Sequence, residues 1–94
     1  MTRDKNLLQI KKIIFKYDKV QKVILFGSRA RSDNDSRSDI DLAIDCPNMD
    51  DNDYRNLVTE LREARIILKL DIHRFDKLGD DEFKNRILKE GTKL

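Results

Sequence analysis

Large apolar residues alternate with aspartate or alanine between positions 39 and 45, and this alternation constrains the fold more than any other feature of the sequence. Successive side chains of a β-strand point to opposite faces of its sheet. The pattern therefore predicts a strand with one apolar face, formed by Ile40, Leu42 and Ile44. Asp39 and Asp41 share the other face, where two neighbouring anions repel each other and add nothing to stability. A cation is expected between them, and a divalent metal ion is the simplest candidate.

A second segment, residues 66–75, repeats the same pattern. Its apolar face is expected to carry Leu68, Leu70 and Ile72, and its polar face Lys69, Asp71 and His73. If the two strands lie side by side, Asp71 joins Asp39 and Asp41 in an oxygen-rich site suited to Mg²⁺. Two such ions about 3.5–4 Å apart can assist both the attacking and the leaving oxygen of a phosphoryl transfer. His73 could act in catalysis, but a lone histidine is more often a surface or hydrogen-bonded residue, and the second interpretation is favoured.

Upstream of these carboxylates, the apolar run at residues 23–26 predicts a strand buried on both faces, and it ends at Gly27. Glycine lets the backbone approach a ligand closely, and a short helix expected over residues 28–31 would offer its N-terminal N–H groups to phosphate. Ser28 adds a hydroxyl donor. Arg29 and Arg31 either pair with phosphate oxygens or belong to a solvated helix surface. An anion-binding turn beside metal-binding carboxylates describes a nucleoside triphosphate site, although neither GxxxxGK[ST] nor GxGxxG occurs.

Much of the remaining sequence has apolar residues at helical spacing. Apolar stripes predict three longer helices, one around Leu7, Leu8, Ile10, Ile13, Ile14 and Tyr17, one around Tyr54, Leu57, Val58 and Leu61, and one around Phe83, Ile87 and Leu88. Acidic residues precede the second and third helices, and Gly91 is the expected end of the last. The predicted order α-β-α-β-α-β-α indicates an α/β (α+β) fold, a small mixed β-sheet with helices packed on one face.

Composition limits the remaining possibilities. The 94 residues suffice for one modest core, so we expect residues 1–94 to form a single domain. Charged residues make up 40% of the chain, yet 20 basic and 18 acidic residues leave a net charge of only +2, which gives no reason to expect direct nucleic-acid binding. No secretion signal or membrane-length apolar run is found, and the single cysteine allows no intrachain disulfide. We therefore expect a cytoplasmic protein.

The three motifs together resemble a known family. Residues 25–31 (LFGSRAR), residues 38–44 (SDIDLAI) and residues 70–72 (LDI) resemble the minimal nucleotidyltransferases of the DNA polymerase β superfamily, and most closely the MNT-domain antitoxins paired with HEPN toxins. The resemblance covers nearly the whole chain and implies a palm-like fold. It implies that Gly27 and Ser28 grip the triphosphate and that Asp39, Asp41 and Asp71 are the catalytic metal-binding carboxylates.

The resemblance further implies a Mg²⁺-dependent transfer of AMP from ATP to a tyrosine of a partner HEPN toxin, which neutralises the toxin. Two alternatives stay open. The protein could neutralise its partner by occlusion alone, in which case neutralisation would survive replacement of Asp39 and Asp41 by Asn. It could instead modify a small hydroxylated molecule, which would release pyrophosphate without any protein partner.

Overall fold

The computed structural model describes residues 5–27, 40–64 and 70–94. Its elements follow the chain in this order: α1 (Lys5–Ile14), β1 (Lys22–Phe26), β2 (Ile40–Asp45), α3 (Asp51–Glu63), β3 (Leu70–Arg74), a 3₁₀ turn η1 (Phe75–Lys77), α4 (Asp81–Glu90) and β4 (Thr92–Lys93). The predicted short helix at residues 28–31 and the first part of the predicted strand, residues 66–69, lie outside the described residues. Within the described residues, no helix is long and apolar enough to cross a membrane.

The four strands form one mixed sheet in the order β3-β2-β1-β4. β1 runs antiparallel to both β2 and β4, whereas β2 and β3 are parallel. This parallel pair is the arrangement that aligns the two alternating segments of the sequence, with Ile40 opposite Leu70 and Leu42 opposite Ile72. The expected mixed α/β sheet is therefore confirmed, and β4 is a short edge strand that the sequence pattern did not predict.

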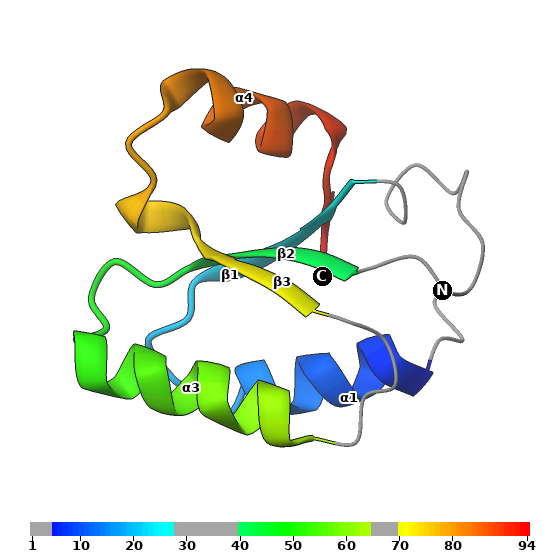
Figure 1. The fold of residues 1–94 in the computed structure, drawn as a ribbon, viewed down its shortest axis with the longest axis vertical. Coiled ribbons are helices and arrows are strands. Elements are labelled where there is room, and N and C mark those ends of the chain that lie inside the picture. The colour runs from blue at the N-terminus through cyan, green and yellow to red at the C-terminus, as the bar shows by residue number, and fades with distance from the viewer. Residues whose placement is uncertain (1–4, 28–39, 65–69) are drawn as a thin grey trace.

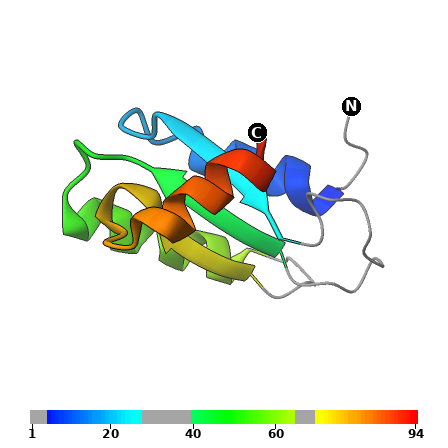
Figure 2. The same cartoon turned by 90° about the horizontal axis from the view of Figure 1, so that it is seen from above.

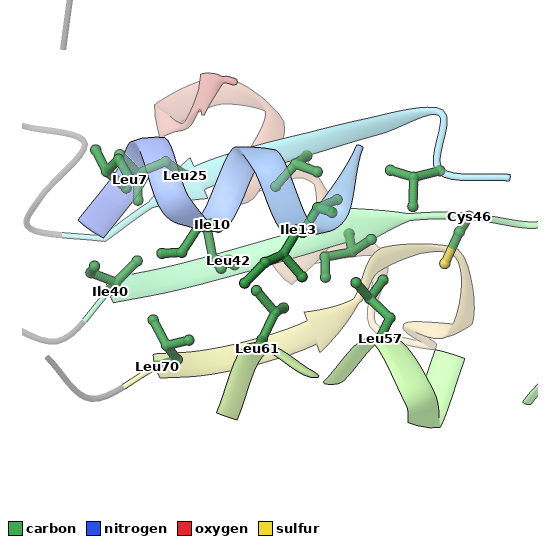
Figure 3. Packing of buried hydrophobic residues seen from close by; sticks show 14 of the residues in the cluster. Leu7, Ile10, Ile13, Leu25, Ile40, Leu42, Cys46, Leu57, Leu61 and Leu70 are labelled. Carbon is green, nitrogen blue, oxygen red and sulfur yellow. The ribbon is translucent and has the colours of Figure 1, made fainter. Parts of the chain in front are cut away.

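The larger part of the core lies between one face of the sheet and the helices α1 and α3 (Figures 1 and 3). The apolar faces of the strands meet the apolar stripes of the helices there, with these residues fully buried: Ile10, Ile14, Ile40, Leu42, Ile44, Leu57 and Leu61. Leu8, expected to widen the first helical stripe, is instead 47% exposed. Burial of this apolar surface provides the main stabilisation of the fold.

The expectation that helices cover only one face is wrong. α4 lies on the face of the sheet opposite α1 and α3 (Figures 1 and 2), where Ile87 packs with Ile24, Ala43 and Phe75 in a second, smaller cluster. The physical reason is that β1 carries apolar side chains on both faces. Ile24 lies on the face away from α1 and α3, and α4 shields it from solvent. Leu88, expected on the packed stripe of α4, is 51% exposed.

The ends of α3 and α4 agree with the sequence signals. Asp50 caps α3 by accepting a hydrogen bond of 2.7 Å from the N–H of Asp53, and Asp80 caps α4 in the same way with Phe83 at 3.1 Å. Gly91 ends α4 as predicted. A Cβ at Gly91 would overlap with the side chain of Ile24 and the carbonyl of Ile87, so only glycine lets α4 end this close to β1.

Candidate active site

One row of side chains crosses three neighbouring strands at the end of the sheet where β1 stops. Phe26 is the register partner of Asp41, and Asp41 is in turn the register partner of Asp71. Residues directly opposed on paired strands project from the same face of the sheet. Ala43, two residues along β2 from Asp41, packs in the cluster under α4, so both carboxylates lie on the face that α4 partly covers. The structure thus brings together two of the three predicted carboxylates.

Gly27 adjoins this row. It follows β1 directly and has a φ of 81°, a backbone conformation that glycine adopts without penalty. A Cβ at Gly27 would lie 3.2 Å from Cγ of Asp41 and would overlap with its Oδ2. Glycine is therefore required here both by the backbone and by the position of the Asp41 carboxylate. The glycine and the carboxylate, separated along the sequence, meet at one point of the fold.

His73 lies beside Asp71 on β3. Its Nε2 is 3.6 Å from Oδ1 of Asp71, and its ring centroid is 5.7 Å from that of Phe26 and 5.6 Å from that of Phe83. Phe26 and Phe83 are themselves 5.9 Å apart in an edge-to-face arrangement. These three rings, Phe26, His73 and Phe83, connect the sheet to α4 next to the carboxylates.

Four of the residues predicted for the site, Ser28, Arg29, Arg31 and Asp39, lie outside the described residues. In the part of the chain that is described, no group of three His, Cys, Asp or Glu side chains is close enough to hold a metal ion. Asp41 and Asp71 nevertheless suit one chemically, because aligned carboxylates on adjacent strands present the hard oxygen donors that Mg²⁺ prefers. The side chain of Asp71 is 57% exposed, which leaves it accessible to a second molecule.

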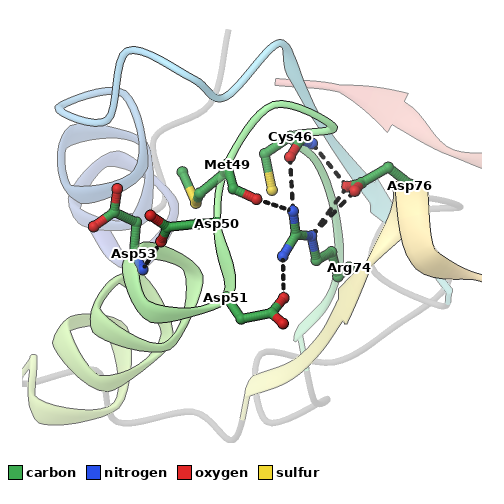
Figure 4. A network of polar contacts seen from close by, with 7 residues as sticks. All are labelled: Cys46, Met49, Asp50, Asp51, Asp53, Arg74 and Asp76. Atoms are coloured by element: carbon green, nitrogen blue, oxygen red, sulfur yellow. Dashed lines mark hydrogen bonds and ion pairs between the residues drawn. The ribbon is translucent and has the colours of Figure 1, made fainter.

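A buried arginine that the sequence analysis missed stabilises the opposite end of β3 (Figure 4). The Arg74 side chain is only 8% exposed, and its Nε donates to Oδ2 of Asp76 at 3.1 Å. The same guanidinium donates to Oδ1 of Asp51 at 3.2 Å and to the carbonyl oxygens of Cys46 and Met49. It therefore ties the end of β3 to the loop between β2 and α3. No local sequence pattern predicts this network, because its members come from β3, η1, α3 and the loop before α3.

Asp76 and Cys46, two members of this network, have shifted pKa values. Burial would raise the pKa of the Asp76 carboxyl, but hydrogen bonds from the N–H groups of Cys46 and of Asp76 itself, together with Arg74, outweigh it and hold this pKa below its usual 3.8. Burial, with Asp76 nearby, raises the pKa of the Cys46 thiol to about 11. Cys46 is therefore a protonated, buried thiol at neutral pH and plays no part in the carboxylate site.

Residues 8–94 match the family described as Polymerase beta, Nucleotidyltransferase. Because this match spans nearly the whole chain, and Gly27, Asp41 and Asp71 meet in the fold, the protein belongs to this family of nucleotidyltransferases. None of the curated proteins compared with the chain matches it.

Solved structures of toxin–antitoxin complexes contain chains of the same fold. A variant of the MntA–HpeT complex gives a TM-score of 0.74 at 22% identity, over 97% of this chain and 72% of that one. A toxin–antitoxin structure with AMP-PNP gives a TM-score of 0.71 at 21% identity, over 96% and 72% of the two chains. The tri-AMPylated Shewanella oneidensis HEPN toxin in complex with MNT antitoxin gives 0.62 at 22% identity, over 94% and 70%. At these identities the similarity establishes the fold.

Proposed function

We propose that this protein is a Mg²⁺-dependent nucleotidyltransferase that transfers AMP from ATP to a tyrosine of a partner HEPN toxin and so acts as an antitoxin. The observation that carries the proposal is the alignment of Asp41 with Asp71 beside the turn at Gly27. Membership of the nucleotidyltransferase family supports the reaction class. The similar folds found with AMP-PNP and with a tri-AMPylated HEPN toxin support the choice of donor and acceptor.

In this proposal two groups of residues hold the donor, one that contacts the triphosphate directly and one that binds metal ions. Gly27 and Ser28 present backbone N–H groups and a hydroxyl to the triphosphate, and Arg29 and Arg31 pair with its oxygens. Asp39, Asp41 and Asp71 would together hold two Mg²⁺ ions, and the chemistry that such ions would supply is neutralisation of phosphate charge.

The transfer itself is an in-line substitution at the α-phosphorus. The tyrosine oxygen forms a bond to the α-phosphorus while the bond from that phosphorus to the bridging oxygen breaks, and pyrophosphate leaves. The proton of the tyrosine hydroxyl passes to the Asp71 carboxylate, whose exposed side chain can be reached by an acceptor on a second protein. Holding donor and acceptor in this geometry supplies much of the rate enhancement.

Label transfer from ATP carrying a labelled α-phosphate tests the proposal. The protein is mixed with Mg²⁺ and with its proposed partner, a HEPN toxin encoded by an adjacent gene, and recovery of the complex is measured in the same samples. We expect a labelled partner with the wild type and no label with Asp39→Asn/Asp41→Asn. Asp18→Asn is the matched control, because Asp18 is an exposed carboxylate in the turn that leads to the other end of β1, and it should transfer label normally.

An unlabelled partner recovered in a stable complex with the wild type would contradict the catalytic proposal. The same result would favour the alternative in which the protein neutralises its partner by occlusion.

A further inference from the structure

A pocket of about 270 Å³ lies where α4 meets the end of β1. The residues of its lining that the structure describes come from β1, from the turn after it and from α4: Phe26, Gly27, Phe83, Arg86, Ile87 and Glu90. The Asp41 carboxylate occupies the space that a Cβ at Gly27 would take, so the pocket and the candidate active site share this residue. A molecule with one end bound at Gly27 can therefore place its other end in the pocket.

The lining defines the chemistry of an occupant. Sites that enclose a whole small molecule usually measure about 300–1,000 Å³, so this pocket suits one part of a larger ligand. Phe26 and Phe83 offer ring surfaces of the kind on which nucleic-acid bases stack. Arg86 adds hydrogen-bond donors and Glu90 adds an acceptor. A flat ring system whose edge carries both donors and acceptors fits this combination.

Arg86 of the charged pair at the pocket can change partners at little cost. Nε of Arg86 lies 3.5 Å from Oε2 of Glu90, and the two side chains are 70% and 41% exposed. Exposed ion pairs one helical turn apart contribute little to stability. The exposed Arg86 side chain can consequently turn toward a ligand without weakening the fold.

We infer that this pocket binds the heterocyclic base of the nucleoside triphosphate donor, with the ring against Phe83 and its polar edge at Arg86 and Glu90. This inference rests on the proposed function, since that function places the triphosphate at Gly27. In this arrangement the side chains of α4 contact the nucleoside end of the donor. The rival occupant is the ring of the acceptor tyrosine, and the two are separated by experiment.

Comparing ATP with inorganic triphosphate isolates the contribution of the nucleoside. Binding of each ligand is measured by calorimetry in the presence of Mg²⁺, for the wild type, Phe83→Leu and Arg86→Ala. Phe83→Leu removes the aromatic ring and keeps an apolar side chain, and Arg86 is exposed, so both variants should fold. We expect each variant to weaken ATP binding by about tenfold and to leave triphosphate binding unchanged.

Arg55→Ala is the matched control, because Arg55 is an exposed arginine on α3, against the other face of the sheet. ATP affinity unchanged by both pocket variants would overturn the inference, and so would an equal loss of affinity for both ligands. If the variants instead raise only the KM for the protein acceptor in label transfer, the pocket belongs to the tyrosine, and this result would also overturn the inference. Failure of the wild type to bind ATP would contradict the proposed function itself.

Discussion

Gly27 shows at the scale of one residue how the backbone and the site depend on each other. Its φ of 81° turns the chain out of β1, and its missing side chain leaves room for the carboxylate of Asp41. Asp41 itself is fixed by pairing of β2 with strands on both sides. The turn and the carboxylate are thus held in one relative position before any ligand binds, as an efficient transfer site requires.

Gly27→Ala should damage both stability and catalysis. The left-handed conformation costs a residue with a Cβ about 1–2 kcal/mol, and the new methyl group would displace Asp41. We expect the free energy of unfolding to fall by about that amount in urea denaturation. Displacement of a reacting group by about 1 Å can cost a hundredfold in rate, so label transfer should fall by about a hundredfold.

Gly79→Ala is the control for this substitution, since a Cβ at Gly79 meets nothing within 4 Å. It should leave both stability and transfer close to wild type. Equal losses in the two variants, or normal transfer by Gly27→Ala, would show that the contact between Gly27 and Asp41 does not matter.

At the scale of the elements, the Arg74–Asp76 pair joins the end of β3 to the loop before α3. Asp76 accepts hydrogen bonds both from Arg74 and from the N–H of Cys46, and its side chain is only 9% exposed. Breaking such a pair leaves buried polar groups unsatisfied. This junction therefore holds β3 in the register that aligns Asp71 with Asp41.

Asp76→Asn should lower stability in a pH-dependent way. Because the folded-state pKa of Asp76 lies below its usual 3.8, its ionised form stabilises the fold at pH values above about 3.8, and this stabilisation is lost as the pH falls through the lower, folded-state pKa. At neutral pH we expect the variant to lose about 1.5–3 kcal/mol, the range for hydrogen bonds to charged groups. When unfolding is followed by circular dichroism at decreasing pH, the difference in the free energy of unfolding between wild type and variant should become smaller below about pH 4.

Glu60→Gln is the control for acid sensitivity. A hydrogen bond from Lys16, together with one from Tyr17, lowers the pKa of Glu60, so this carboxylate also adds to the loss of stability in acid. The Glu60 variant should keep the part of the acid dependence that comes from Asp76. A constant difference in the free energy of unfolding between wild type and Asp76→Asn from pH 7 to pH 3 would contradict the proposed dependence of stability on the ionisation of Asp76.

The elements also show what a sequence can and cannot predict. Alternation at residues 39–45 and the acidic residues that precede the second and third helices are local signals, and they predicted β2, α3 and α4. The face covered by α4 was mistaken because it depends on the apolar residues that β1 contributes to both faces. The burial of Arg74 was missed because three of its four partners are distant in sequence. β4 was missed because a two-residue strand has no periodicity.

At the scale of the molecule, the sheet brings residues of the candidate active site from distant parts of the chain into one row. The parallel pairing of β2 with β3 sets Asp71 beside Asp41, and the antiparallel pairing of β1 with β2 brings the Gly27 turn to the same end. α1 and α3 stabilise this sheet from one side, and α4 forms a wall on the other. The larger part of the core and the candidate active site thus lie on opposite faces of one sheet.

A double-mutant cycle on Asp41 and Asp71 tests most directly whether this row works as one catalytic unit. Label transfer is measured for Asp41→Asn, Asp71→Asn and the double variant, with complex recovery confirming that each protein still folds. Residues that act as a unit give strongly non-additive effects. We expect each single variant to lose roughly a thousandfold or more in rate and the double variant to be no slower than the worse single one.

The pair Asp41→Asn and Asp18→Asn serves as the reference cycle, in which Asp18→Asn should change nothing in either background. Effects of Asp41→Asn and Asp71→Asn that multiply in the double variant would mean that the two carboxylates act independently. Normal transfer by Asp71→Asn would remove β3 from the active site and contradict the proposed catalytic row.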